Sequence, residues 1–405
     1  MKRFNKFLSV AVASAMVMSM AGCGNTDNGS AATGTNAATE SAAASESAAS
    51  GSVFKIGGIG PTTGGAAVYG LAVQHGAEIA VEEINAAGGI NGYQVEFKFQ
   101  DDEADAEKSV NAYNALKDWG AQIIDGSTTS GACIAVTDKT KEDNMFQITP
   151  SGSAVECVQY DNNFRVCFSD PNQGLASAQY IGENGLAEKI AVIYDSSDVY
   201  SSGIYEKFAK EAENQPFEIV AAEAFTADNK TDFSVQLQKA KDAGADMVFL
   251  PIYYQESALI LTQAAAMGYA PKWFSCDGMD GILGGVDNFD VSLTEGVMLL
   301  TPFAADATDD LTQSFVTKYK EKYGETPNQF AADSYDAIYV IKAAIEKSGV
   351  TPDMSVSDIC DGMKAAMTEI TVDGLTGNGM TWTADGEANK APKAVVIENG
   401  AYKAM

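Results

Sequence analysis

From Val53 onward the sequence alternates apolar runs with amphipathic stretches, and this alternation limits the fold more than any other feature. The run Lys55–Ile59 predicts a first strand, and Val73, Ala77 and Ile84 then recur on one face at helical spacing. A similar apolar run, Lys189–Tyr194, predicts another first strand in the second half of the chain. Repeated strand and helix units of this kind predict an α/β fold with parallel sheets.

These two similar first strands predict two α/β units in tandem, that is, two Rossmann-like lobes joined by three crossing strands. We expect the crossings near Phe168, Thr301 and Gly377. The N-terminal lobe would then comprise residues 53–168 and 303–377, and the C-terminal lobe residues 169–302 and 378–405. A ligand between the lobes would touch loops of both, and closure about the hinge would bury it.

The N-terminus has the features of an export signal. Basic residues precede an apolar stretch, Phe7–Met20, which is shorter than the roughly 20 residues that span a membrane. Met20-Ala21-Gly22-Cys23 resembles the lipobox of bacterial lipoproteins, which implies a signal peptide over residues 1–22 and a lipidated Cys23. Residues 24–52 contain no aromatic residue and no Val, Ile or Leu, so residues 23–52 are expected to form a disordered tether.

Charge and cysteine content narrow the classes of partner. The formal net charge is −29, which disfavours nucleic acid and anionic lipid as partners. Apart from Cys23 there are five cysteines, without CxxC or metal-ligand spacing. Cys157 and Cys167 are close enough in sequence to close a small disulfide loop, and the alternative is that the thiols are small buried apolar groups.

Hydroxyl groups follow two neighbouring predicted strands, and this is the main candidate site. They are Ser127, Thr128, Thr129, Ser130, Ser151 and Ser153. Ligands bind beyond the carboxyl ends of strands in open α/β sheets, and hydroxyls with free N–H groups at a helix start hold a small anion. The alternative is that these residues only cap helices and form turns.

Signatures of enzymes are largely missing. His75 is the only histidine, and no GxSxG, HExxH, P-loop or EF-hand pattern occurs. Gly58-Ile59-Gly60 suggests a dinucleotide loop, but Pro61 interrupts it. We therefore predict no catalytic residue, no metal and no cofactor.

Four segments resemble one known family. GPTTGGAAVYG, HGAEIAVEEINAAGGINGYQVEF, QDDEADAEKS and IYYQE are similar to the branched-chain amino acid binding proteins of ABC importers, which are type I periplasmic binding proteins. The resemblance extends from Phe54 to about Ala394. A disulfide found in some relatives is absent, because the matching positions lie near Ala104 and Thr129.

The resemblance implies an α-amino acid bound as a zwitterion between the lobes. The matching positions for its carboxylate are Ser130, Ser151 and Ser153, and Asp277 matches the acid that pairs with the ammonium. Tyr69, Tyr200 and Tyr253 match aromatic residues of the cleft. Thr128 and Met279 are candidates for contact with the ligand side chain.

The predicted function is therefore that of an extracytoplasmic solute-binding lipoprotein, anchored to the outer face of the cell membrane. It would bind a branched-chain or other apolar amino acid, act as a monomer and deliver the ligand to an ABC permease. The alternatives are a ligand-sensing domain of the same fold, a binder of amides or other small organic solutes, and an enzyme that uses Asp and Tyr side chains in the cleft.

Overall fold

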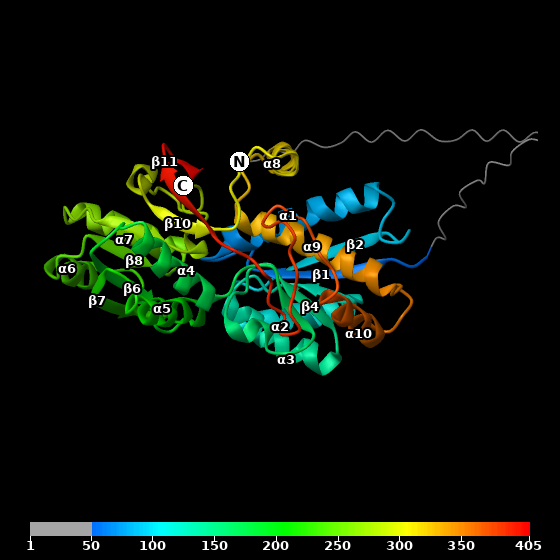
Figure 1. The fold of residues 1–405 in the computed structure, drawn as a ribbon. Helices are drawn as coiled ribbons and strands as arrows, with labels where there is room; N and C mark the ends of the chain where they lie inside the picture. The colour runs from blue at the N-terminus through cyan, green and yellow to red at the C-terminus, as the bar shows by residue number, and fades with distance from the viewer. Residues whose placement is uncertain (1–50) are drawn as a thin grey trace, which may run out of the picture. The chain divides into compact units, whose positions relative to one another are not determined.

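The computed structural model describes residues 51–405, which form a two-lobed α/β protein (Figure 1). The first lobe is built on a parallel five-stranded sheet in the order β2-β1-β3-β4-β5. Its strands are β1 (Phe54–Gly60), β2 (Val95–Asp101), β3 (Ile123–Asp125), β4 (Phe146–Thr149) and β5 (Asn163–Arg165). Because all five strands run the same way, their carboxyl ends lie at one edge of the sheet.

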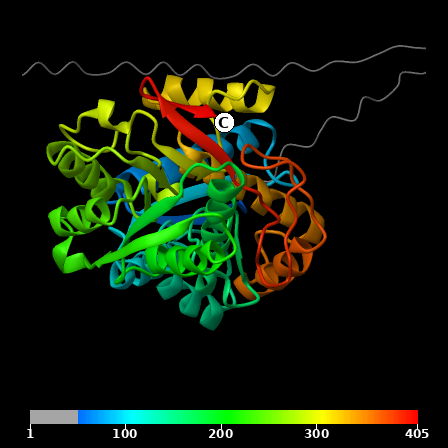
Figure 2. The same ribbon diagram turned by 60° about the vertical axis from the view of Figure 1, so that its left-hand side comes forward.

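The second lobe is built on a seven-stranded sheet in the order β12-β11-β10-β9-β8-β6-β7. Its strands are β6 (Lys189–Asp195), β7 (Glu218–Phe225), β8 (Met247–Leu250), β9 (Lys272–Ser275), β10 (Met298–Thr301), β11 (Lys393–Glu398) and β12 (Ala401–Ala404). Pairing is parallel from β7 to β10 and antiparallel through β11 and β12. The chain therefore ends in a strand pair at one edge of this sheet (Figure 2).

Helices are divided between the lobes by their packing. The first lobe has α1 (Ala67–Ala86), α2 (Ala106–Trp119), α3 (Ser130–Asp143), α8 (Asp310–Tyr323), α9 (Gln329–Ser348) and α10 (Val356–Met367). The second has α4 (Asp170–Glu183), α5 (Val199–Ala212), α6 (Ser234–Asp242) and α7 (Tyr254–Ala266). The late helices α8 and α9 pack on α1, so the chain returns to the first lobe after β10 (Figure 1).

The predicted α/β class and parallel sheets are confirmed. Several elements were not predicted, namely β5, β7, β12, α4, α6 and α10. His75 is a partly buried packing residue, stacked on Tyr323 with ring centroids 3.6 Å apart.

The third crossing between lobes has its own contacts. Trp382 donates its indole N–H to the Arg165 carbonyl at 2.7 Å, and the Arg165 N–H donates to the Gly386 carbonyl at 3.1 Å. Residues 382–386 therefore lie along β5 of the first lobe. The lobe boundary at Gly377 stays a prediction, and these contacts favour a crossing closer to Lys390.

All five cysteines of the described residues are buried free thiols, so Cys157 and Cys167 form no disulfide. Cys157 instead contacts the Ser130 carbonyl, with 3.7 Å between sulfur and oxygen. Cys23, the signal peptide and all but the last two residues of the expected tether lie outside the described residues.

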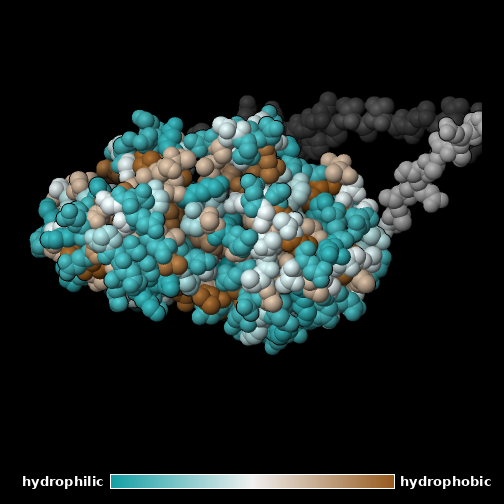
Figure 3. All heavy atoms as spheres, in the orientation of Figure 1, coloured by the Kyte–Doolittle hydropathy of each residue, from teal (hydrophilic) through white to brown (hydrophobic). Residues whose placement is uncertain are grey.

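The surface of the protein is mostly polar, as its acidic composition leads one to expect. The face in Figure 3 is mostly hydrophilic, with apolar residues in small separate groups. Within residues 51–405, no helix combines the length and the apolar character needed to cross a bilayer.

Candidate functional site

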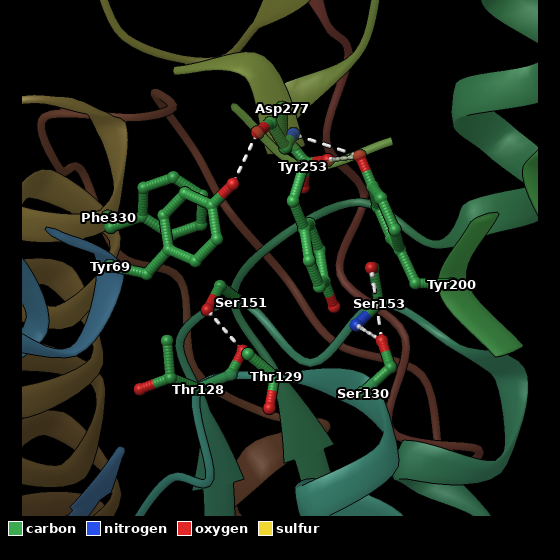
Figure 4. A pocket seen from close by; sticks show the side chains of 11 residues that line it. Tyr69, Thr128, Thr129, Ser130, Ser151, Ser153, Tyr200, Tyr253, Asp277 and Phe330 are labelled. Atoms are coloured by element: carbon green, nitrogen blue, oxygen red, sulfur yellow. Dashed lines mark hydrogen bonds between the residues drawn. The ribbon is translucent and has the colours of Figure 1, made fainter. Parts of the chain in front are cut away.

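One pocket between the lobes brings together all seven residues predicted to contact a ligand (Figure 4). They are Tyr69, Ser130, Ser151, Ser153, Tyr200, Tyr253 and Asp277, joined by Thr128, Thr129, Gly278 and Phe330. These side chains leave little free space between them, so the two lobes are closed on each other at this site.

The hydroxyl side of the pocket is made by the ends of β3 and β4. Ser130 is the first residue of α3, and its Oγ accepts the N–H groups of Ser153 and Ala154, both at 3.1 Å. Ser151 donates its hydroxyl to the Thr128 carbonyl at 2.6 Å. Because Ser130 Oγ already accepts two bonds, its own hydrogen is available to an acceptor in the pocket. The N-terminus of α3 adds positive potential, so this side suits an anion.

Arg165 lies directly behind this turn, and sequence reasoning missed it. Its side chain has no exposed surface, and its guanidinium donates to the carbonyls of Ser153 at 2.5 Å and Ala154 at 2.9 Å. Glu387 lies 3.4 Å from the Arg165 Nε. A buried guanidinium with fixed partners holds the turn in shape and places a positive charge behind the hydroxyls. The available signal was that Arg165 is the only arginine after Arg3.

Aromatic rings form the walls of the pocket. Tyr200 and Tyr253 stack with centroids 5.1 Å apart, and Tyr69 packs on Tyr253 at 5.4 Å and on Phe330 at 4.4 Å. Phe330 comes from the first turn of α9 and was not predicted. Met279 was a candidate for contact with a ligand side chain, but it is buried outside the residues that line the pocket.

Asp277 forms the acidic pole of the pocket. Its side chain is 5% exposed, and its Oδ1 accepts the Tyr200 hydroxyl at 2.6 Å. The Tyr200 oxygen in turn accepts the Gly278 N–H at 2.9 Å. Burial raises the pKa of Asp277 to about 7, against the opposing effect of the hydrogen bond from Tyr200. Among residues 51–405 no basic group lies within salt-bridge distance of this carboxylate, so a cationic ligand group would stabilise its ionised form.

A second buried acid, Asp170, was also missed by sequence reasoning. It is the first residue of α4, is 1% exposed, and donates its N–H to the Ser153 carbonyl at 2.9 Å. Neither carboxylate oxygen has a hydrogen-bond partner within the described chain. Burial, together with the charge of Asp277, raises the pKa of Asp170 well above its usual range. Asp277 is therefore the acid that lines the pocket, whereas Asp170 lies behind the turn at Ser153.

Nearly the whole described chain matches one known family. A family model described as periplasmic binding protein matches residues 53–401. The chain belongs to this family.

Named relatives agree with the more specific resemblance. A "Leu/Ile/Val-binding protein homolog 3" of Brucella melitensis is 31% identical over 300 residues, which is 74% of this chain and 80% of that protein. The crystal structure of a branched-chain amino acid transporter substrate binding protein, LivJ, from Streptococcus pneumoniae in complex with isoleucine matches with a TM-score of 0.78 and 29% identity. The leucine binding protein LivK of Thermotoga maritima matches with a TM-score of 0.76 and 28% identity. Each structural match covers 87% of this chain and 98% of the other. The predicted resemblance to branched-chain amino acid binding proteins and the predicted fold class are confirmed.

Proposed function

We propose that this binding protein captures a branched-chain or other apolar α-amino acid and delivers it to an ABC permease. The observation that carries the proposal is a single small pocket with an anion-binding turn at one pole and a buried carboxylate at the other. Only a ligand with both charges satisfies both poles. The names of the relatives support the same class of ligand, since they bind leucine, isoleucine or valine.

In this proposal the ligand carboxylate accepts hydrogen bonds at the turn of Ser130, Ser151 and Ser153. Its ammonium pairs with Asp277. A desolvated ammonium needs such a partner, because an unpaired buried charge costs several kcal/mol. Both ionic groups would be buried, which matches a site that closes over its ligand.

The apolar side chain of the ligand would lie among the aromatic walls. Tyr69 and Phe330 extend from the first lobe and Tyr253 from the second, so the ligand would contact both lobes at once. A ligand that makes more contacts with the closed form than with the open form shifts the protein towards the closed form. The role is binding without the making or breaking of covalent bonds, as befits a family of substrate-binding proteins.

Attachment to the cell surface through Cys23 belongs to the same proposal, as does a monomeric state. Membership in a periplasmic binding protein family supports an extracytoplasmic location. A lipid anchor would keep the body close to the permease. Mass analysis of the amino-terminal peptide after export tests the anchor, and an unmodified Cys23 would contradict it.

A thermal-shift screen tests the ligand class. The purified protein is heated with free amino acids, amides and organic acids, and a ligand at about 100 times its dissociation constant should stabilise it by about 2.7 kcal/mol. We expect leucine, isoleucine and valine to give the largest shifts. A response to amides or organic acids, with none to amino acids, would replace the proposed ligand class.

A further inference from the structure

The loop that contains Asp277 belongs to the second lobe by sequence but packs on the first. It follows β9 and approaches α1 closely, since a Cβ added at Gly281 would lie 2.7 Å from a methyl carbon of Val68. Tyr69, also on α1, donates its hydroxyl to the Gly278 carbonyl. The candidate ammonium partner therefore lies on a segment that both lobes contact.

Gln329, the first residue of α9, makes two hydrogen bonds to this loop. Its side-chain amide donates to the Asp277 carbonyl at 3.1 Å, and its backbone N–H donates to Asp280 Oδ2 at 2.9 Å. Gln329 is 1% exposed, and Asp280 is buried as well. One residue of the first lobe thus holds both ends of the short segment Asp277–Asp280, and the second bond also satisfies a free N–H at the start of α9.

Other contacts of Asp277 arise within the second lobe. Tyr200 binds its carboxylate, and the Asp277 N–H donates to Gln173 Oε1 at 3.3 Å. Both partners belong to helices of that lobe, so these bonds persist if the lobes separate. The bonds from Gln329, by contrast, cross between the lobes, so separation of the lobes would break them.

We propose that Gln329 is a positioning residue that fixes Asp277 from the opposite lobe and so completes the ammonium site only on closure. This inference rests on the proposed binding of a zwitterionic amino acid. Phe330, the next residue, lines the pocket, so the first turn of α9 contributes a wall to the ligand and an anchor to the loop. Stabilisation of the closed form by such bonds slows ligand release, because the lobes must separate before the ligand leaves.

The experiment compares wild type with Gln329→Met, which keeps the length of the side chain but removes the amide. L-leucine and L-isoleucine serve as probes in stopped-flow and equilibrium binding. Loss of one buried hydrogen bond should weaken affinity by up to about tenfold, and the Asp277 carbonyl then keeps only the N–H of Asp280, at 2.8 Å. We expect the weaker affinity to come from faster dissociation of the ligand, while the association rate and the ligand-free melting temperature stay unchanged.

Gln74→Met is the matched control, because Gln74 lies on α1 of the first lobe and bonds only locally, to Glu78 at 2.9 Å. It should bind like wild type. Wild-type affinity and dissociation rate in Gln329→Met would overturn the inference. A loss expressed as slower association or a lower ligand-free melting temperature would also overturn it, since that would indicate a merely structural role. If wild type binds neither leucine nor isoleucine, the proposed function fails and this inference fails with it.

Discussion

Binding of an amino acid should depend on pH through Asp277. Its pKa is raised to about 7 by burial, so near neutral pH a substantial part of the ligand-free protein has a neutral Asp277. Only the ionised carboxylate pairs with the ammonium of the ligand. Affinity should therefore be constant well above pH 7 and should fall as the pH drops through that value.

The size of the effect follows from proton linkage at one site. For a pKa of about 7, the apparent dissociation constant should double at about pH 7 and rise about elevenfold at pH 6, relative to its value at high pH. At about pH 7, binding should release roughly half a proton. Neither end of a free amino acid titrates in this range, so the change reports on the protein.

Isothermal titration calorimetry with L-leucine, in buffers that differ in ionisation enthalpy, measures affinity and proton release together. The control is Asp277→Asn, which keeps the shape but cannot titrate. It should bind at least about a hundredfold more weakly, because the ammonium loses its charged partner, and its affinity should not vary with pH. A wild-type affinity that is constant between about pH 6 and 8 would refute the reasoning. A slope that persists in Asp277→Asn would assign the proton to another group.

Three further changes test separate parts of the site. Without ligand at about pH 8, Asp277→Asn should raise the melting temperature. The pKa of Asp277 is higher in the folded than in the unfolded protein, so the wild type loses stability as the pH rises from about 4 to 7, and the asparagine variant does not. An unchanged or lower melting temperature would contradict the raised pKa. Phe330→Ala should weaken leucine binding tenfold or more by calorimetry while affecting alanine much less, and equal losses would argue against contact with the ligand side chain. Lys390→Met should destabilise the protein by about 3–5 kcal/mol in urea unfolding. The substitution leaves the buried Asp333 without the Lys390 ammonium, which lies 2.6 Å from its carboxylate. Lys139 forms an exposed ion pair, so the control Lys139→Met should change stability little.

Much of the fold was predictable because its central strands are short apolar runs buried on both faces. The elements that were missed lack this pattern for physical reasons. β7 (EIVAAEAF) is an edge strand that lacks a regular apolar and polar alternation, and most of its side chains are partly exposed. α4 contains Gly174, where an added Cβ would lie 2.4 Å from the Ile204 carbonyl of α5. Close packing of these two helices requires this glycine, which weakens the helical signal of α4 in the sequence.

The candidate site was predicted in two different ways. The hydroxyl turn follows from two adjacent strand ends, whereas Asp277 and the three tyrosines came only from the family resemblance. Arg165, Asp170 and Phe330 could not be found, because each is a single residue whose partners lie elsewhere in the sequence. Trp382 and Arg165, for example, are 217 positions apart. Contacts of that range leave no local pattern.

The isolation of Arg165 has a practical consequence. It is the only guanidinium after Arg3, and it lies wholly inside the protein. Burial lowers the pKa of His75, so the exposed cations of residues 51–405 at neutral pH are lysine amines. Reagents that acylate amines would thus remove almost all positive charge from the outside of the body while the cation behind the serine turn stays intact. Such a preparation would show whether capture of the ligand depends on the external lysines.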